Sequence, residues 1–159
     1  DPEQAVGHYD LIAERYRKNG LADDALWHAA RLLRKLKRPE DAVVRLRTLQ
    51  ARREIAFGTG SYLSIWHDDG QLEMATILRD DLGQGNRAAR EFRKLHELYP
   101  DSILRDDALF GEALSWKSAG EPQRACAVLD ELAKKHPESK YRRQSPELRQ
   151  ELGCAADPG

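Results

Sequence analysis

A spacing of 37 residues recurs along this chain and constrains its fold more than any other feature. Three pairs of identical residues keep that spacing: Gly83 and Gly120, Ala88 and Ala125, and Pro100 and Pro137. Ala5 and Ala42 keep it too, whereas the step from Ala42 to Ala88 is 46 residues, so that interval carries nine extra residues. A repeat of this length predicts a stack of similar units, each burying its apolar face against its neighbours.

The clearest unit covers residues 106–139 and contains two helical patterns. An acidic pair opens the first pattern, where negative charge suits the helix dipole. Gly120 permits a tight turn, Pro122 suits the first turn of the next helix, and Pro137 ends it. Each helix has its own apolar stripe: Leu109, Ala113 and Trp116 on the first, and Ala125, Leu129 and Leu132 on the second. The unit therefore predicts two helices joined by a turn.

These residues resemble the tetratricopeptide repeat. Leu109 falls on that family's large residue, Ala113 on its small residue, Trp116 on its aromatic residue and Pro137 on its terminal proline. Glu112 stands where a leucine is usual. The same phase over residues 69–102 places Leu72, Thr76, Ala88, Phe92 and Pro100 on family positions, with Arg79 in place of the aromatic residue. The resemblance implies an all-α fold, a right-handed α-solenoid of antiparallel helix pairs.

One domain over residues 1–159 follows from this resemblance. Its expected parts are a lone second helix at 1–19, repeats at 20–55, 69–102 and 106–139, an insertion at 55–68 and a C-terminal capping helix at 145–153. Asp1 is expected to cap the first helix, Ser145 to cap the last one, and Gly153 to end it. The lone first helix exposes an edge, which either receives earlier repeats or pairs with a second copy as a homodimer.

The "YPDS" and "HPES" turns at 99–102 and 136–139 narrow the resemblance further. Such turns, in repeats slightly longer than the common 34 residues, are similar to those of tetratricopeptide proteins of the bacterial cell envelope. Those proteins include outer-membrane assembly lipoproteins and Tol–Pal-associated periplasmic proteins. The resemblance implies a periplasmic or outer-membrane-associated scaffold, and a cytoplasmic location stays open.

Charge and cysteine content exclude several other classes of function. The 26 basic and 27 acidic residues leave a net charge of −1, which favours neither nucleic acid nor an anionic membrane. No apolar run approaches the roughly 20 residues of a membrane span. Cys126 and Cys154 have no metal-site spacing. We expect Cys126 to be a buried helix residue and Cys154 to lie in a frayed tail, and a disulfide between them stays open.

Acidic pairs and histidines are the remaining candidates for catalytic or metal-binding residues. The pairs Asp23–Asp24, Asp68–Asp69 and Asp106–Asp107 share one repeat phase at the start of a helix, so helix capping explains them. The five histidines form no metal motif, and His67 beside Asp68 and Asp69 is the only cluster with metal-like character. We therefore expect a protein that is not an enzyme, with no catalytic residue, metal or cofactor.

In the family that this chain resembles, the first helices of the pairs line a concave groove. The resemblance places these residues there: Asp24, Trp27, Arg31, Arg34 and Lys35 from the first repeat, Glu73, Ile77, Asp80 and Asp81 from the second, and Phe110, Leu114 and Lys117 from the third. The expected function is a scaffold that binds a protein or peptide partner in this groove. In the competing interpretation, Trp27 and Phe110 pack against a neighbouring helix and bind nothing.

The insertion at 55–68 gathers three aromatic residues, Phe57, Tyr62 and Trp66. They form either a projecting loop that docks a partner or aromatic packing between longer flanking helices. If the insertion or the N-terminal edge bound another copy, the chain would be a self-association module. That is the alternative to the scaffold.

Overall fold

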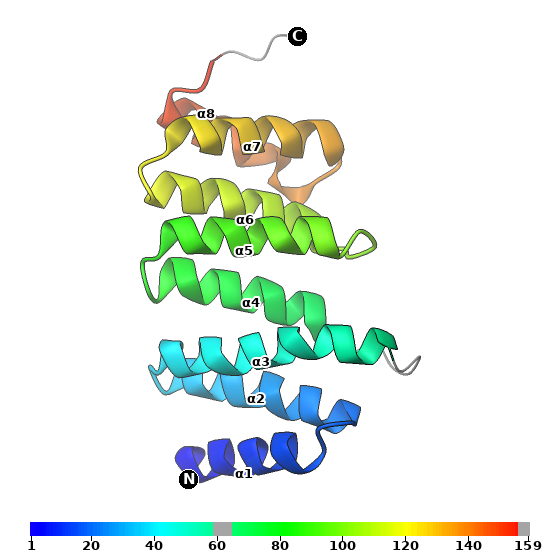
Figure 1. The fold of residues 1–159 in the computed structure, drawn as a ribbon. Helices are drawn as coiled ribbons and strands as arrows, with labels where there is room; N and C mark the ends of the chain where they lie inside the picture. Colours follow the sequence, from blue (N-terminus) through cyan, green and yellow to red (C-terminus); the bar gives the residue numbers. More distant parts are fainter. Residues whose placement is uncertain (59–64, 156–159) are drawn as a thin grey trace.

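The computed structural model describes residues 1–58 and 65–155, with side chains described outside residues 53–58. Its elements are α1 (Pro2–Arg15), α2 (Gly20–Lys35), α3 (Pro39–Gly58), α4 (His67–Asp80), α5 (Gly85–Leu98), α6 (Arg105–Ser118), α7 (Pro122–Lys135), η1 (Lys140–Arg143) and α8 (Ser145–Leu152). The described residues contain no strand, and consecutive helices stack from one end of the molecule to the other (Figure 1). The prediction of an all-α solenoid is confirmed.

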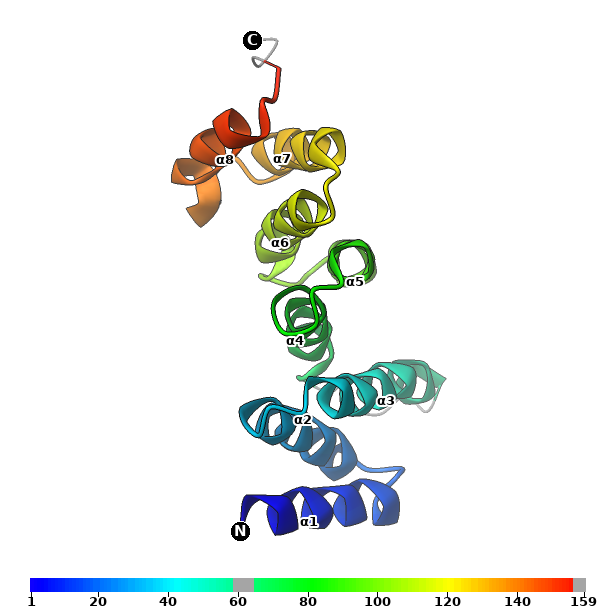
Figure 2. The same ribbon diagram turned by 90° about the vertical axis from the view of Figure 1, so that its left-hand side faces the viewer.

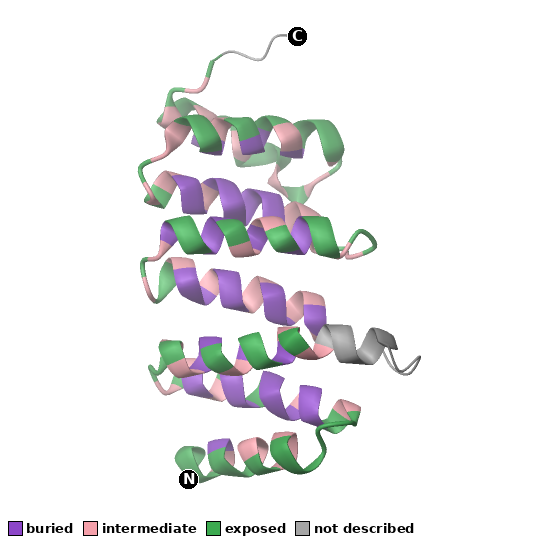
Figure 3. Cartoon of the chain, in the orientation of Figure 1, coloured by how far each residue is buried: buried purple, intermediate pink, exposed green. Residues whose placement is uncertain are grey.

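The helices form two rows. Seen from the side, α2, α4 and α6 lie in one row, and α3 and α5 lie in the other (Figure 2). Buried residues run along α2, α4 and α6 where they face their neighbours (Figure 3). No helix within the described residues is long and apolar enough to cross a membrane.

Small residues let the helices approach closely. Six alanines recur at the points of closest packing and have no exposed surface: Ala30, Ala75 and Ala113 on the first helices, and Ala42, Ala88 and Ala125 on the second helices. Gly111 plays the same role on α6, because a Cβ atom there would lie 2.5 Å from the Phe92 ring on α5. Phe92 fills that space and is almost wholly buried.

The structure corrects the register of the second repeat. α6 begins 38 residues after α4, whereas α7 begins 37 residues after α5. The extra residue lies in the turn at 81–84, which is one residue longer than the turn at 119–121. The buried stripe of α4 is therefore Gln71, Ala75 and Leu78, and the expected positions Leu72 and Thr76 are only half-buried. The phase assigned from sequence was wrong by one residue on this helix.

The final serine of each proline-containing turn binds the aspartate at the start of the same repeat. Ser102 donates a hydrogen bond to Oδ2 of Asp68 at 2.7 Å, and Ser139 donates one to Oδ2 of Asp106 at 2.8 Å. The first repeat lacks the proline, and its second helix continues instead. Arg52 on that helix pairs with the buried carboxylate of Asp23. All three repeats thus satisfy the acidic residue at their start.

The two ends of the chain are held in different ways. Asp1 caps α1 as expected, because its carboxylate accepts a hydrogen bond from the Glu3 amide at 2.9 Å. Ser145 does not cap α8: its hydroxyl donates to the Tyr141 carbonyl at 2.9 Å, and the N-cap residue is Gln144. Gly153 ends α8 with a φ of 66°, a conformation that favours glycine.

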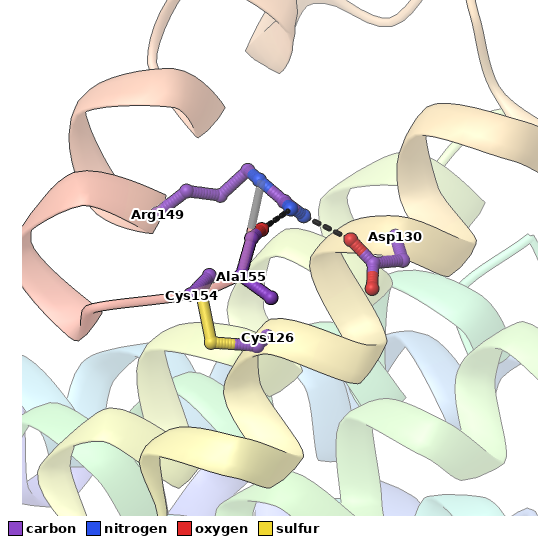
Figure 4. The surroundings of a disulfide bond; sticks show 5 residues. All are labelled: Cys126, Asp130, Arg149, Cys154 and Ala155. Atoms are coloured by element: carbon purple, nitrogen blue, oxygen red, sulfur yellow. Dashed lines mark hydrogen bonds and ion pairs between the residues drawn. A yellow bond between two sulfur atoms is a disulfide. The ribbon is translucent and has the colours of Figure 1, made fainter. Parts of the chain in front are cut away.

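A disulfide joins Cys126 on α7 to Cys154, whose Cα atoms are 5.5 Å apart (Figure 4). Arg149 on α8 supports the same fold-back, because it pairs with Asp130 and donates a hydrogen bond to the Ala155 carbonyl at 2.8 Å. The expectation of a frayed tail at Cys154 was therefore wrong. Cys126 is half-buried rather than fully buried, because its sulfur faces the returning chain.

Candidate functional site

The candidate site is the side of α2, α4 and α6 that faces away from α3 and α5, which we call the helix-A face (Figure 2). The residues expected to line a groove on it differ in exposure. Exposed or half-buried are Asp24, Arg31, Arg34, Lys35, Glu73, Asp80, Asp81, Leu114 and Lys117, whereas Trp27, Ile77 and Phe110 are buried. Ile77 has no exposed surface. In the corrected register, Thr76 instead is the residue of α4 that corresponds to Leu114 of α6.

Trp27 packs between two repeats. Its ring stacks on that of Trp66 with centroids 5.1 Å apart, and the Trp66 indole N–H donates a hydrogen bond to Oδ1 of Asp24 at 2.5 Å. The Arg31 guanidinium lies 5.5 Å from the centre of the Trp27 ring. Trp66 thus packs against α2, as the second interpretation of the insertion expected. Tyr62 and the Phe57 side chain lie outside the described residues.

Phe110 repeats this arrangement at the other end of the stack. Its ring stacks on Tyr141 of η1 with centroids 4.1 Å apart, and the Tyr141 hydroxyl donates to Oδ1 of Asp107 at 2.6 Å. Lys140 donates to Oδ2 of the same carboxylate at 2.8 Å. Burial, followed by the hydrogen bond to Asp107, raises the pKa of Tyr141.

Lys140 and Tyr141 were not singled out from the sequence. The only signal in the sequence was their position along the chain. Tyr141, two residues after Ser139, lies in the segment that leads into α8, and Trp66, two residues before Asp68, lies in the segment that leads into α4. Trp27 and Phe110 therefore serve contacts between repeats, and a partner meets only what remains exposed around them.

Several charged residues of the helix-A face already bind one another. Arg34 on α2 pairs with Glu73 of α4 at 3.0 Å and with Asp81, the residue that follows α4, at 2.6 Å. Arg79 pairs with its neighbour Asp80, and Lys117 pairs with Glu151 at 2.6 Å. The pairs of Arg34 join α2 to the α4 region, and the pair of Lys117 joins α6 to α8.

Arg31 and Lys35 are exposed on α2, and no carboxylate of the described residues pairs with either. They make the first repeat the basic part of the helix-A face. Half-buried apolar or weakly polar side chains follow on the next helices, Leu72 and Thr76 on α4 and Leu114 on α6. The face thus offers charge at one end and apolar contact further along.

The described residues hold no group of three or more histidine, cysteine or acidic side chains that could bind a metal ion. His67, the candidate ligand of the sequence, is buried at the start of α4. Two shallow hollows lie elsewhere. One hollow of about 400 Å³ lies between the segments 102–106 and 135–139. One of about 570 Å³ borders the disulfide.

Comparison with known proteins identifies the repeats. The family model of the tetratricopeptide repeat matches residues 69–102 and 107–139. These two stretches begin 38 residues apart, which agrees with the register of α4 and α6 in the structure. A search of curated proteins found no match.

Proposed function

We propose that this chain, with its tetratricopeptide repeats, is a scaffold without catalytic activity that binds a protein or peptide partner on the helix-A face. Tetratricopeptide repeats in general mediate contacts between proteins, and repeat solenoids use their extended concave surface for binding. The observation that carries the proposal is the exposed pair Arg31 and Lys35, which no carboxylate of the described residues neutralises. Arginine is among the residues enriched at the energetic centres of protein interfaces.

The disulfide supports an oxidising compartment, and we propose the bacterial periplasm or the periplasmic side of the outer membrane. Disulfides persist in secreted and periplasmic proteins and are rare in a reducing cytosol. Cys126 and Cys154 are 28 residues apart in sequence, and the fold of α7 and α8 brings them together. This observation is independent of the turn motifs that suggested the same location.

The test is a pull-down from envelope and cytosolic fractions of the source cells, with purified protein as bait. The variant Arg31→Glu/Lys35→Glu reverses both exposed charges of α2 and leaves the buried Trp27 in place. The control, Arg47→Glu/Arg90→Glu, makes the same charge change at exposed positions of α3 and α5. We expect a partner from the envelope fraction that binds the wild type and the control but not the first variant.

Two results would contradict the scaffold on the helix-A face, and a third would contradict only the compartment. A partner held equally by both variants would move the binding surface away from the helix-A face. Recovery of only the same chain would favour the alternative of self-association, and light scattering against concentration would then measure it. A partner found only in the cytosolic fraction would refute the proposed compartment and leave the scaffold intact.

A further inference from the structure

We call the segments that lead into α4, α6 and α8 the first, middle and third junctions, and a three-residue arrangement occurs at the first and the third. In each, an aspartate near the start of α2 or α6 accepts a hydrogen bond from an aromatic residue of the junction segment. That aromatic residue also stacks on a ring one turn after the aspartate. The members are Asp24, Trp27 and Trp66 at the first junction, and Asp107, Phe110 and Tyr141 at the third.

The middle junction has the aspartate but not its donors. Ser102 and Ser139 accept hydrogen bonds from the amides of Leu104 and Tyr141, each at 3.1 Å, so these two residues are equivalent. Asp69 and Leu72 correspond to Asp107 and Phe110, and Ile103–Leu104 replaces Lys140–Tyr141. Neither replacement can donate a hydrogen bond from its side chain.

The Asp69 carboxylate therefore has no hydrogen-bond donor or counter-charge among the described residues. It is half-buried, and no described residue donates a hydrogen bond to it or forms an ion pair with it. Its neighbour Asp68 is bound by Ser102. Burial, and then the negative charge of Asp68, raises the pKa of Asp69. A half-buried carboxylate without a counter-charge is costly, and the equivalent carboxylate of Asp107 has both a hydroxyl and an ammonium group.

The residues that stand in place of Lys140, Tyr141 and Phe110 at the middle junction are all aliphatic. Leu72 and Leu104 are half-buried, and Ile103 is 90% exposed at the position where Lys140 stands in the next repeat. Ile103 also lines the hollow of about 400 Å³ between the two turns. A lysine or arginine side chain suits such a place, because its aliphatic stem packs on apolar residues while its charged end reaches a carboxylate. Leu72 stands where the stacking ring of Phe110 stands in the next repeat, so an aromatic side chain has no equivalent ring to stack on.

We infer that the middle junction binds a lysine or arginine side chain of the partner, with its charged end on Asp69 and its stem along Ile103 and Leu104. The partner thereby supplies the donor that Trp66, Tyr141 and Lys140 supply within the chain at the first and third junctions. This inference rests on the proposed function and gives it a sequence preference. The partner segment carries a basic residue where it crosses from α4 to α6.

The first test selects peptides from a random 12-residue library displayed on phage, with the wild-type protein as target. The selected peptides are then synthesised and measured against Asp69→Asn, which removes the charge at almost constant shape. Asp101→Asn is the matched control, because Asp101 is exposed and no described residue pairs with it. We expect lysine or arginine at one fixed position. We also expect Asp69→Asn to weaken binding about tenfold or more, with no change for Asp101→Asn.

The outcomes separate the inference from the proposed function. Peptides that lose affinity on Arg31→Glu/Lys35→Glu but not on Asp69→Asn, or that lack a fixed basic residue, would refute the inference and leave the scaffold standing. Recovery of no peptide would count against a peptide-binding scaffold, and with it against the inference.

The second test rebuilds the missing donors. The double variant Ile103→Lys/Leu104→Tyr gives the middle junction the pair that the third repeat has in Lys140 and Tyr141. We expect the introduced lysine and tyrosine to bind the Asp69 carboxylate within the chain. The melting temperature should therefore rise, and the affinity for the selected peptides should fall. Because the variant is expected to be more stable, loss of binding cannot come from unfolding. Unchanged peptide affinity in a variant of raised melting temperature would overturn the inference.

Discussion

One histidine shows how packing sets the charge of a single residue. His96 is 3% exposed at the end of α5, and its Nε2 atom lies 3.4 Å from Nε2 of His136 and 3.3 Å from the Arg105 guanidinium. Burial, and then the positive charge of Arg105, lowers the pKa of His96 from 6.5 to about 4. His96 is therefore neutral in the folded protein at pH 7.

This shift predicts a dependence of stability on pH. The unfolded chain binds a proton at His96 below about pH 6.5, and the folded chain does so only below about pH 4. Between these values protons favour unfolding, so the free energy of unfolding falls as the pH is lowered through this window. Urea unfolding at pH 7 and pH 5 measures the effect. His96→Gln should flatten the slope between the two pH values, and an equal slope in both proteins would contradict the assignment to His96.

Two glycines in helices predict opposite effects of the same substitution. Gly111→Ala places a Cβ atom 2.5 Å from the Phe92 ring, so α5 and α6 must separate. We expect a loss of about 1–3 kcal/mol in the free energy of unfolding. Gly7→Ala in α1 is the control, because nothing lies within 4 Å of that Cβ position. It should stabilise α1 by about 0.5–1 kcal/mol. Thermal unfolding of both variants measures the two changes. If the free energy of unfolding changed in the same direction in both, the packing argument would be wrong.

At the scale of the helices, a charged network holds α5, α6 and α7 together. Glu112 is 4% exposed on α6, where the family usually has leucine, and it pairs with Arg93 of α5 at 2.8 Å. Arg93 also forms two hydrogen bonds with Glu131 of α7. The Trp116 indole N–H donates to Glu112 at 3.1 Å. Arg93 thus joins the second helix of one repeat to both helices of the next.

A double-mutant cycle measures this network. Arg93→Met alone leaves the buried Glu112 carboxylate without a counter-charge, and we expect a loss of about 3 kcal/mol in the free energy of unfolding. Glu112→Leu in the same chain removes that carboxylate and restores the family's usual residue, so most of the loss should be recovered. Urea unfolding of the two single variants and the double variant provides the numbers. Additive losses would show that the two residues do not depend on each other.

The helices also show what sequence could and could not predict. The apolar stripes and the Gly and Pro turns predicted the α6–α7 pair, because those signals act locally. The register of α4 was missed, because one extra residue in the turn at 81–84 shifts the first helix relative to the second. The pairing of Arg52 with Asp23 was missed as well, because a long-range ion pair leaves no periodic pattern. For the same reason, Lys140 and Tyr141 were found only in the structure.

At the scale of the whole molecule, stability depends on contacts between neighbouring repeats. The apolar core divides into two clusters that meet at α5, which gives Ala88 and Phe92 to one and Ala89 to the other. The C-terminal cluster ends at α8, the last helix of the stack. The disulfide between Cys126 and Cys154 and the Arg149–Asp130 pair join the end of α8 to α7.

Removing the disulfide should therefore have a local effect. We expect Cys126→Ala/Cys154→Ala to destabilise the C-terminal end by about 2–4 kcal/mol, because the closed loop no longer restricts the unfolded chain. Amide hydrogen exchange should rise in α7 and α8 and stay unchanged in α2 and α3. The wild type measured with and without reductant is the matched comparison. A uniform rise along the whole chain would show that the solenoid unfolds as one cooperative unit.

The same disulfide affects how the chain responds to tension. Helices α1 and α8 lie at opposite ends of the stack (Figure 1), so a force applied across the stack pulls the repeats apart one after another. The segment between Cys126 and Cys154 is a closed loop, and force passes through the sulfur–sulfur bond instead of through it. About 90 Å of extended chain is thereby withheld from stretching, at about 3.4 Å for each residue of the loop. Under load, the segment from Cys126 to Cys154 stays short, while α6 and the helices before it lengthen.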